Sequence, residues 1–492
     1  MDRAKDARND RSIKGGSSFL SLDAATLAEQ AGDKAGWLAE RIREAVNTGH
    51  LVAGERLPPS RVLATELGVS RGVVTESYTR LADAGLVAAL GRGGTVVCGG
   101  PSAARPNPNN AARIPTATVD PFGSTADFET LRAASCRIDL SPGVPDVRSF
   151  PRAAWLRAER TVLSTAQLTD LAYGQAQGAL PLRTAISRWV ARTRGITCLP
   201  DDVIVVAGVA QALSLLAHQR KANGAATVAV EDPGSLGARQ QLNAWGIRTP
   251  AIPVDDDGLD VDALRQHTAS TVMVTPAHQF PTGVVLTGQR RVELLEWARN
   301  GNLVIEDDYD AEHRYDRRPV PALAADEPES VYYMGSVSKI LAPALRIGWV
   351  IAPRSMTAAI VDLKRDTDLG NATVPQLSLA HLMNSGDLER HLRTMRSRHR
   401  RRRDVMIGAL RTRIPHAVIV GAAAGLHLTI LLPDDLDDTA VAARCLQAGV
   451  KMHPLSWHRQ SPGPPGLVLG YAASTEADIA EGIDAVAQSI AE

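Results

Sequence analysis

The spacing of apolar residues changes along the chain and divides it into two regions. Between residues 34 and 97 the apolar positions first recur at helical intervals, as in Leu38, Ile42 and Val46, and then at the short intervals of two strands. From residue 136 onward short apolar runs alternate with helical patterns. The runs at 203–206, 227–230, 271–274 and 302–305 predict short buried strands. Strands that alternate with helices indicate an α/β domain with a mostly parallel sheet.

The segments that flank these regions have a different composition. Residues 1–33 have mixed charge and predict a flexible tail. Residues 98–135 are rich in glycine, proline and asparagine and contain few large apolar residues, so we expect a linker. The predicted order is therefore tail 1–33, small helical domain 34–97, linker 98–135 and α/β domain 136–492.

Composition limits the possible partners. A chain of 492 residues is too long for one core, and its formal net charge of zero means that any nucleic-acid binding must come from local patches. The four cysteines form no CxxC pair, which argues against a zinc site and fits a reducing cytoplasm. No run of 18 apolar residues is present, so we expect no membrane partner and a cytoplasmic protein.

The small domain has the pattern of a helix-turn-helix. We expect Ser60 to cap a second helix with Val62, Leu63 and Leu67 inside, and Gly68 to end it in the left-handed conformation. Ser70 should cap a third helix, whose outer face carries Arg71, Thr75, Glu76 and Thr79. The N-terminal residues of such a helix can enter the major groove of DNA.

Residues 54–61 through 93–96 closely resemble the winged helix of the GntR family of regulators. The resemblance implies DNA contacts by Arg61, Ser70, Arg71 and Thr75, with Arg92 and Gly93 at the tip of the wing. The alternative is a helical packing domain whose arginines are only solvated. Between residues 34 and 100 the excess of basic over acidic residues is only two, from eight Lys/Arg and six Asp/Glu. Such a weak excess favours a dimer that holds two half-sites or direct repeats of double-stranded DNA, so that the protein is associated with the nucleoid when it is bound.

Lys339 has the neighbours that pyridoxal phosphate requires. It follows Ser336 and Ser338 and precedes Arg346, while Asp307 and Tyr309 follow an earlier predicted strand. A lysine amine forms a Schiff base with the aldehyde, hydroxyls and a guanidinium hold the phosphate, and a carboxylate pairs with the pyridinium nitrogen. The strand 203–206 runs into a glycine turn and a helix that begins near Val209 and Ala210, and such a helix N-terminus offers free N–H groups to an anion.

Residues from about 137 to 490 resemble fold-type I aminotransferases in the form that is fused to a GntR winged helix, the MocR subfamily. The motifs that carry the resemblance lie at 171–174, 230–234, 275–283, 306–310, 336–346, 425–427 and 469–472. The expected fold is a large mixed, mostly parallel sheet with a small C-terminal subdomain.

The resemblance also implies roles for individual residues. Lys339 would form the internal aldimine, Asp307 would pair with the pyridine nitrogen, and Tyr309 and Gln279 would approach the ring oxygen. The phosphate would be held by Val209, Ala210, Ser336, Ser338 and Arg346. Tyr173 aligns with a tyrosine that reaches the phosphate across the dimer interface, so a homodimer is implied.

Three positions depart from the family pattern. Ser235 stands where an aromatic residue commonly stacks on the ring, and Gly237 stands where a relative that responds to GABA has a carboxylate-binding arginine. Leu467 aligns with the carboxylate arginine of aminotransferases, and Arg239 is a possible substitute. Loss of a bidentate arginine leaves an amino-acid carboxylate without its partner.

These departures favour a regulator that senses pyridoxal phosphate through Lys339, as subfamily members that control vitamin B6 synthesis do. An amino-acid co-ligand stays open. The alternatives are a working aminotransferase with a fused DNA-binding domain and a cofactor-free dimerisation scaffold.

Eight arginines stand between residues 390 and 403, at positions 390, 393, 396, 398, 400, 401, 402 and 403. With Leu392 and Met395 nearby, they predict a charged amphipathic helix. A solvated helix face is the favoured interpretation, and a second contact to the DNA backbone is the alternative.

Overall fold

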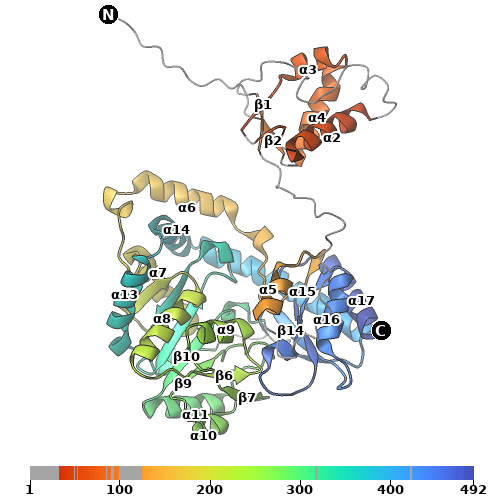
Figure 1. Ribbon diagram of the computed structural model, residues 1–492. Coiled ribbons are helices and arrows are strands. Elements are labelled where there is room, and N and C mark those ends of the chain that lie inside the picture. The colour runs from red at the N-terminus through yellow and green to blue at the C-terminus, as the bar shows by residue number, and fades with distance from the viewer. Residues whose placement is uncertain are drawn as a thin grey trace, which may run out of the picture. The chain divides into compact units, whose positions relative to one another are not determined.

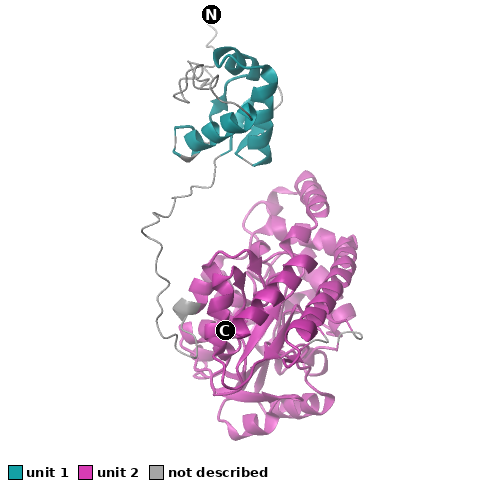
Figure 2. Cartoon of the chain, turned by 90° about the vertical axis from the view of Figure 1, so that its right-hand side faces the viewer, with its two compact units in different colours: residues 1–117 teal, residues 118–492 magenta. Residues whose placement is uncertain are grey.

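The computed structural model describes residues 33–48, 50–52, 54–84, 86–89, 94–98, 125–315, 320–421 and 424–491. The chain divides into two compact units, residues 1–117 and 118–492 (Figure 2). Within the described ranges, no helix is long and apolar enough to span a lipid bilayer.

The described part of the first unit contains three helices and a small antiparallel sheet in the strand order β1-β3-β2 (Figure 1). Its elements are α2 (Lys34–Asn47), β1 (Arg56–Leu57), α3 (Ser60–Glu66), α4 (Arg71–Asp83), β2 (Val87–Ala89) and β3 (Thr95–Val97). Leu38, Ile42, Leu63 and Leu81 are fully buried between the helices. This is the winged helix-turn-helix that the apolar spacing predicts.

Two local predictions for this unit are wrong. Ser60 is the first residue of α3 and makes no capping hydrogen bond, because Pro59 takes the N-cap position. Val62 is exposed rather than internal, since it lies about 100° around the axis of α3 from the buried Leu63. Ser70 does cap α4, where its Oγ accepts from the Val73 N–H at 3.4 Å. Gly68 is left-handed with φ +64°, as expected.

The second unit is built on an eight-stranded sheet in the order β5-β12-β11-β10-β9-β6-β7-β8. The five strands β11, β10, β9, β6 and β7 run parallel, whereas β12 is antiparallel to both its neighbours and β8 is antiparallel to β7. The bounds are β5 Val203–Val206, β6 Ala229–Asp232, β7 Ala251–Asp255, β8 Gly258–Leu259, β9 Thr271–Val274, β10 Leu303–Asp308, β11 Val331–Ser336 and β12 Gly348–Ile351. The predicted α/β fold is confirmed.

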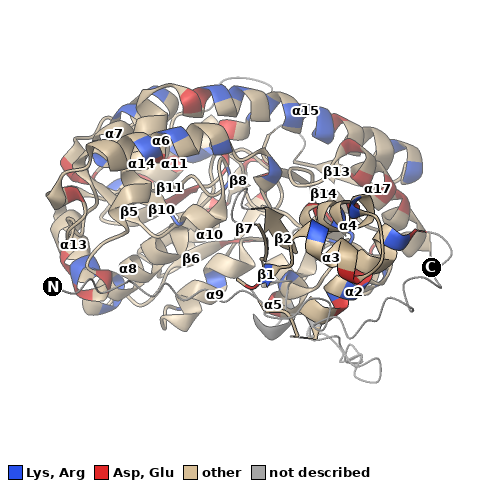
Figure 3. Ribbon diagram, turned by 90° about the horizontal axis from the view of Figure 1, so that it is seen from above, with Lys and Arg blue, Asp and Glu red and all other residues tan. Residues whose placement is uncertain are grey.

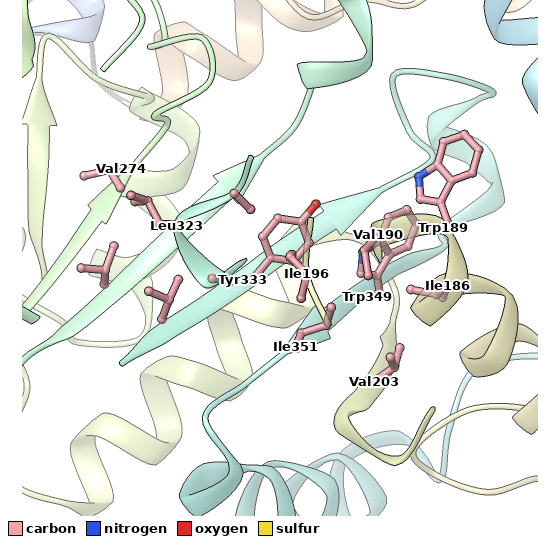
Figure 4. Close-up of a cluster of buried hydrophobic side chains, with 14 of the residues drawn as sticks. Ile186, Trp189, Val190, Ile196, Val203, Val274, Leu323, Tyr333, Trp349 and Ile351 are labelled. Atoms are coloured by element: carbon pink, nitrogen blue, oxygen red, sulfur yellow. The ribbon is translucent and has the colours of Figure 1, made fainter. Parts of the chain in front are cut away.

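Helices cover both faces of this sheet and form two separate cores (Figure 1). The first core is closed by α7 (Leu180–Arg194), α10 (Val261–Gln266), α11 (Gly288–Arg299), α12 (Leu323–Asp326) and α14 (Thr373–Asn384), with α6 (Arg152–Thr165) packed on α14. The second is closed by α8 (Val209–Ala222), α9 (Leu236–Ala244) and α13 (Arg354–Asp368). In the first core Trp349 of β12 lies against Ile186 and Val190 of α7 (Figure 4).

A smaller subdomain follows at the C-terminus. Its sheet has the order β13-β14-β17-β16 and packs on three helices. Its elements are α15 (Asp387–Arg413), β13 (Val418–Val420), β14 (His427–Leu431), α16 (Asp438–Gln447), β16 (His453–Pro454), β17 (Gly466–Gly470) and α17 (Glu476–Ala491), while β15 (Val450–Lys451) pairs separately with β4 (Ile138–Asp139). Helix α15 belongs to both subdomains, because Leu388 and Leu392 enter the first core and Met406 and Leu410 enter the C-terminal core.

The expected linker, residues 98–135, contains a helix. Residues Thr125–Ala133 form α5, and Phe128 packs edge-on against His453 and Trp457 of the C-terminal subdomain. The end of this segment is therefore helical and joined to the second unit. Sequence composition missed it because the segment as a whole is rich in glycine, proline and asparagine and contains few large apolar residues.

The arginine run lies on α15, which carries a row of basic residues (Figure 3). Much of the run is not a solvated face. Arg398 and Arg402 both bind the Asp146 carboxylate at 3.0 Å. Arg396 donates to the Glu312 carbonyl at 2.5 Å, and Arg400 donates to the Tyr315 carbonyl at 2.7 Å. These arginines tie α15 to segments that precede it in the chain.

Candidate functional site

Lys339 follows β11 and lies partly buried near the ends of the central strands. Its Nζ donates a hydrogen bond to the carbonyl of Gly143. Gly143 has φ +72°, and a Cβ atom there would stand 3.1 Å from Nζ. Burial lowers the pKa of Lys339 below its ordinary value, and the charges of Asp310 and Asp307 only partly oppose this shift. The amine can therefore become neutral, and so nucleophilic, more easily than a surface lysine.

Asp307 lies on β10, the strand next to β11, and its backbone pairs with Met334. Its Oδ1 atom is buried and has no hydrogen-bond partner in the described part of the chain. Burial raises the pKa of Asp307 to about 7, and the neighbouring Asp308 adds to the rise, whereas Lys339 opposes it. A buried carboxylate oxygen without a partner fits a protonated ring nitrogen.

Tyr309 lies beside these two residues but its hydroxyl is already engaged. It donates to the His278 carbonyl at 3.1 Å and lies 3.0 Å from His278 Nδ1, which also contacts Asp310 Oδ2 at 2.9 Å. Burial raises the pKa of Tyr309 well above its usual value, so it stays a neutral phenol. His278 and Asp310 were not predicted, although both lie in the motifs at 275–283 and 306–310.

An anion cradle lies at the start of α8. Gly208, with φ +78°, separates β5 from Val209 and Ala210, the first residues of the helix. The Arg346 guanidinium donates to the Ala207 carbonyl, and its Nη atoms stand 3.1 Å from where a Cβ on Gly208 would be. The first N–H groups of a helix have no partner in the helix, so this turn and Arg346 converge on one place.

Ser336, the last residue of β11, lies close to the same cradle because of the order of the strands in the sheet. Strand β12 separates β5 from β11, and Gly348 of β12 pairs with both Val206 and Ser336. A Cβ at Gly348 would stand 3.1 Å from Gly208 Cα and 3.4 Å from Ser336 Cβ, so only glycine leaves this space open. Ser338 is half-buried, and its N–H donates to Ser336 Oγ at 3.3 Å. Gly348 was missed in the sequence, because a lone glycine in a strand has many explanations.

Gln279 is hydrogen-bonded to neighbouring loops. The side chain is buried, its Nε2 donates to the carbonyls of Pro233 and Phe280 at 2.8 and 2.7 Å, and its Oε1 accepts from Thr282. Both ends of the amide are thus committed to holding loops together. Approach of Gln279 to a ring oxygen stays a prediction, and it would require the amide to exchange one of these bonds.

Tyr173 is apart from the other predicted residues within this chain. Its side chain is 92% exposed. No contact of Tyr173 with Lys339, Asp307 or the anion cradle occurs among the described residues. The expected contact across a dimer interface stays a prediction.

The departures from the family pattern have structural counterparts. Ser235 is the N-cap of α9, where its Oγ accepts from the Ala238 N–H at 3.3 Å, and Gly237 faces open space. Leu467 packs into the C-terminal core, whereas Val468 is paired with Thr429 and His453. Val468 rather than Leu467 therefore lies on the face with the site, and both are apolar, so neither offers a guanidinium.

The proposed DNA-contacting residues lie on α3 and α4. Arg61, Arg71 and Thr75 are exposed, and Arg71 Nε donates to Ser60 Oγ at 3.4 Å. Ser70 is exposed as the cap of α4. Arg92 and Gly93, expected at the wing tip, lie outside the described residues.

Comparisons with known proteins agree with both parts of this description. Residues 35–97 match the family model "Bacterial regulatory proteins, gntR family", and residues 137–486 match "Aminotransferase class I and II". The chain is 31% identical over 456 residues to the probable rhizopine catabolism regulatory protein MocR of Rhizobium meliloti, which covers 91% of this chain and 92% of that one.

A second regulator is similar to the same extent. The chain is 32% identical over 444 residues to the HTH-type pyridoxine biosynthesis transcriptional regulator PdxR of Corynebacterium glutamicum, with 89% of this chain and 92% of that one covered. Among solved structures, Pyrococcus horikoshii kynurenine aminotransferase superposes with a TM-score of 0.67 at 28% identity, over 74% of this chain and 93% of that one. The chain thus belongs to the GntR family of DNA-binding transcription regulators, in the MocR-type group that joins a winged helix to a fold-type I aminotransferase-like domain.

Proposed function

We propose that this regulator senses pyridoxal 5'-phosphate through covalent attachment at Lys339 and that the bound cofactor changes its binding to a promoter. The observation that carries the proposal is the unpartnered, buried Oδ1 of Asp307 beside Lys339. Leaving such an oxygen unpaired costs about 1–3 kcal/mol. A protonated pyridine nitrogen would remove that cost, which supports the cofactor over the cofactor-free scaffold.

When bound, the cofactor supplies an aldehyde that can condense with an amine and a pyridine ring that withdraws electrons. The chain's own groups divide the work of binding. The N–H groups at Val209 and Ala210 and the Arg346 guanidinium hold the phosphate, with Ser336 and Ser338 beside them. Asp307 orients the ring by holding a proton at its nitrogen, and Lys339 presents an amine whose pKa is lowered by burial.

We propose a homodimer as the DNA-binding form. A set of exposed apolar side chains on α6 and the segment after it supports this: Leu156, Leu163, Leu168, Leu171 and Tyr173, of which Leu168 is 90% exposed. Large apolar side chains that are exposed together on one segment indicate a protein partner. A second copy would cover these residues and bring Tyr173 to its partner's cradle. Two winged helices would then contact two half-sites.

Regulation requires that the cofactor favour one arrangement of the two units over another.

A titration tests whether the cofactor is sensed through Lys339. Purified protein is titrated with pyridoxal phosphate while fluorescence anisotropy follows a labelled promoter fragment and absorbance follows the lysine adduct. Lys339→Ala should lose both the adduct band and the change in DNA affinity, whereas Lys221→Ala, at the C-terminal end of α8, should keep both. A normal DNA response in Lys339→Ala would refute covalent sensing.

A working aminotransferase is less well supported. Val468 occupies the position of β17 that faces the site and offers no guanidinium, so an α-carboxylate lacks the bidentate partner that this strand supplies in aminotransferases. Adding amino acids to the cofactor-loaded protein should therefore cause no rapid loss of the lysine adduct band. Fast conversion by any common amino acid would favour the enzyme.

A further inference from the structure

The turn that precedes α8 is held at both backbone groups of Ala207. Its carbonyl accepts from the Arg346 guanidinium, and its N–H donates to Gln211 Oε1 at 2.7 Å. Gln211 is the third residue of α8, so its side chain folds back over the start of its own helix. The two bonds fix the peptide planes on either side of Ala207, and so fix the turn from which the N–H groups of Val209 and Ala210 follow.

A second helix, α13, fixes the Gln211 amide. It packs beside α8 (Figure 1). Gln211 Nε2 donates to Asp368 Oδ2 at 2.5 Å, and Gln211 Oε1 also accepts from Lys364 Nζ at 3.2 Å. A carboxylate can only accept and an ammonium can only donate, so these two partners allow one orientation of the amide. The Oε1 atom is therefore kept on the side of the Ala207 N–H.

Lys364 is fully buried, which is rare for a lysine unless it is paired. Its Nζ donates to Asp368 Oδ1 and Oδ2 at 3.0 and 2.8 Å. Burial lowers the pKa of Lys364, and the hydrogen bond and charge of Asp368 oppose that shift. Burial would raise the pKa of Asp368, but hydrogen bonds from Lys364 and Gln211 outweigh it and lower this pKa below its ordinary value. The two charges of the pair cancel, so it adds no net charge beside the cradle.

The direction of the Lys364 side chain sets this pair apart from an ordinary ion pair within a helix. Residues four apart on a helix commonly pair on an exposed surface, where they contribute little. Here the ammonium is buried, and its third bond reaches Gln211 on another helix. Because all three N–H donors of the ammonium are used, Lys364 has none left for a ligand. It can act on the cradle only through Gln211.

The far end of this network is also fixed in place. Asp368 Oδ1 accepts from the Gly370 N–H at 2.8 Å. Gly370 has φ +111°, which favours glycine, and a Cβ there would stand 3.1 Å from the Gln175 carbonyl oxygen and 3.2 Å from Ala176 Cα. The end of α13 is thus packed against the backbone of another segment, and the Gln211 amide is held by a fixed frame rather than by a free surface side chain.

We propose that Gln211 and Lys364 are positioning residues of the anion cradle and that they make the protein select a phosphorylated ligand over its unphosphorylated form. Loss of either side chain releases the Ala207 N–H, so the turn is no longer held in the orientation that suits an anion. Asp307 and Lys339, which hold the rest of the ligand, belong to β10 and to the segment after β11, so only the phosphate should be affected. The inference rests on the proposed function, because it takes the cradle to be the phosphate site.

The probes are pyridoxine 5'-phosphate and pyridoxine, which differ only in the phosphate. Neither carries an aldehyde, so neither can condense with Lys339, and the measurement is independent of covalent sensing. Isothermal titration calorimetry with the full-length, cofactor-free protein gives the dissociation constant of each probe. The unaltered protein should bind the phosphate ester more tightly than pyridoxine.

Gln211→Met and Lys364→Met should each weaken binding of the ester by about tenfold, the effect of one lost hydrogen bond, and leave binding of pyridoxine unchanged. Lys221→Met, at an exposed lysine near the other end of α8, is the matched control and should bind both probes normally. Equal weakening of both probes would show a general structural role, and no weakening would show that the turn does not need these side chains. Either result would overturn the inference.

The double variant tests whether Lys364 acts through Gln211. Gln211→Met combined with Lys364→Met should lose no more ester affinity than Gln211→Met alone, because residues that act in one chain of contacts are not additive. Additive losses, about a hundredfold in total, would show that Lys364 acts on the phosphate independently and would overturn its positioning role. If the unaltered protein does not bind the ester, the cradle is not a phosphate site, and the proposed function fails together with this inference. Tight binding by the unaltered protein and by both single variants would refute this inference alone.

Discussion

Arg346 donates a hydrogen bond to the carbonyl of Ala207, a residue 139 positions earlier in the chain. The contact holds the guanidinium over the glycine turn that begins α8 before any phosphate arrives. An arginine fixed in this way loses little conformational freedom on binding an anion. The cradle is therefore largely formed in advance.

The first prediction concerns this arginine. Arg346→Gln should weaken binding of pyridoxal phosphate by on the order of ten- to a hundredfold, since a hydrogen bond to a charged group contributes about 1.5–3 kcal/mol. Arg354→Gln, a mostly exposed arginine at the start of α13, is the control and should bind as the unaltered protein does. Equilibrium dialysis measures both. Equal affinities of the Arg346→Gln variant and the unaltered protein would show that Arg346 does not bind the phosphate.

Asp307 predicts a pH dependence of the cofactor-free protein. Its pKa is raised to about 7 in the folded state, above the usual value of 3.8, so the folded state favours the protonated acid. The resulting destabilisation is absent below pH 4, grows as the pH rises toward 7 and is constant above that. Asp307→Asn should therefore be more stable than the unaltered protein at pH 8, by on the order of 4 kcal/mol, and equal to it near pH 4.

Urea unfolding at both pH values measures this difference. The same variant should bind the cofactor poorly at pH 8, because an amide cannot pair with a charged ring nitrogen. A variant that is less stable at pH 8 would show that burial does not strain this carboxylate.

The buried pair of Arg194 and Asp308 should be essential to stability. Arg194 Nε lies 2.6 Å from Asp308 Oδ2, the same oxygen that accepts from the Tyr333 hydroxyl at 2.5 Å. Arg194→Met would leave a buried charge uncompensated and should lower the free energy of unfolding by about 3–5 kcal/mol. The double variant Arg194→Met, Asp308→Asn should recover part of that loss. A single variant within 1 kcal/mol of the unaltered protein, by denaturant titration, would contradict this expectation.

Salt dependence separates the two groups of arginines. Arg71→Gln on α4 should reduce the slope of log affinity against log salt for DNA binding by about one, as expected for a lost phosphate contact. Arg41→Gln, exposed on α2 and paired with Glu44, is its control. Unchanged slopes in both variants would show that Arg71 does not contact a DNA phosphate.

Arg402→Gln on α15 should behave differently. Its guanidinium is committed to Asp146 and the Ala472 carbonyl inside the second unit. The change should lower the free energy of unfolding by a few kcal/mol, because a buried carboxylate loses a partner, and leave the salt slope of DNA binding as it was. A reduced slope without a loss of stability would instead support a second contact of this helix with DNA.

The periodic parts of the sequence predicted the fold well. The runs at 203–206 and 271–274 coincide with β5 and β9, because β-strands buried on both faces must be continuously apolar. The helices of the first unit also lie where apolar spacing placed them. Errors arose where two neighbouring residues can both take the same position in a helix. At Ser60 the preceding proline takes the N-cap position.

The sequence predicted which residues belong to the candidate site, but not which of their side chains contact one another. Lys339, Asp307, Arg346 and the turn at Gly208 come together because β5, β12, β11 and β10 are neighbours in the sheet. Gln279 and the choice between Leu467 and Val468 depend on which way a side chain points, and a one-residue shift in a strand reverses that direction.

Helix α15 has a mechanical consequence. It has 27 residues, which is about 40 Å of continuous helix, and it is anchored in two hydrophobic cores at once. Such a rod resists bending, so the C-terminal subdomain cannot swing freely against the large sheet. Any rotation has to pivot about the rod or repack Leu388 and Leu392 at its near end. The two cores therefore behave as one stiff frame, and a signal that starts in the large sheet is carried to the C-terminal subdomain as a rigid-body displacement of α15.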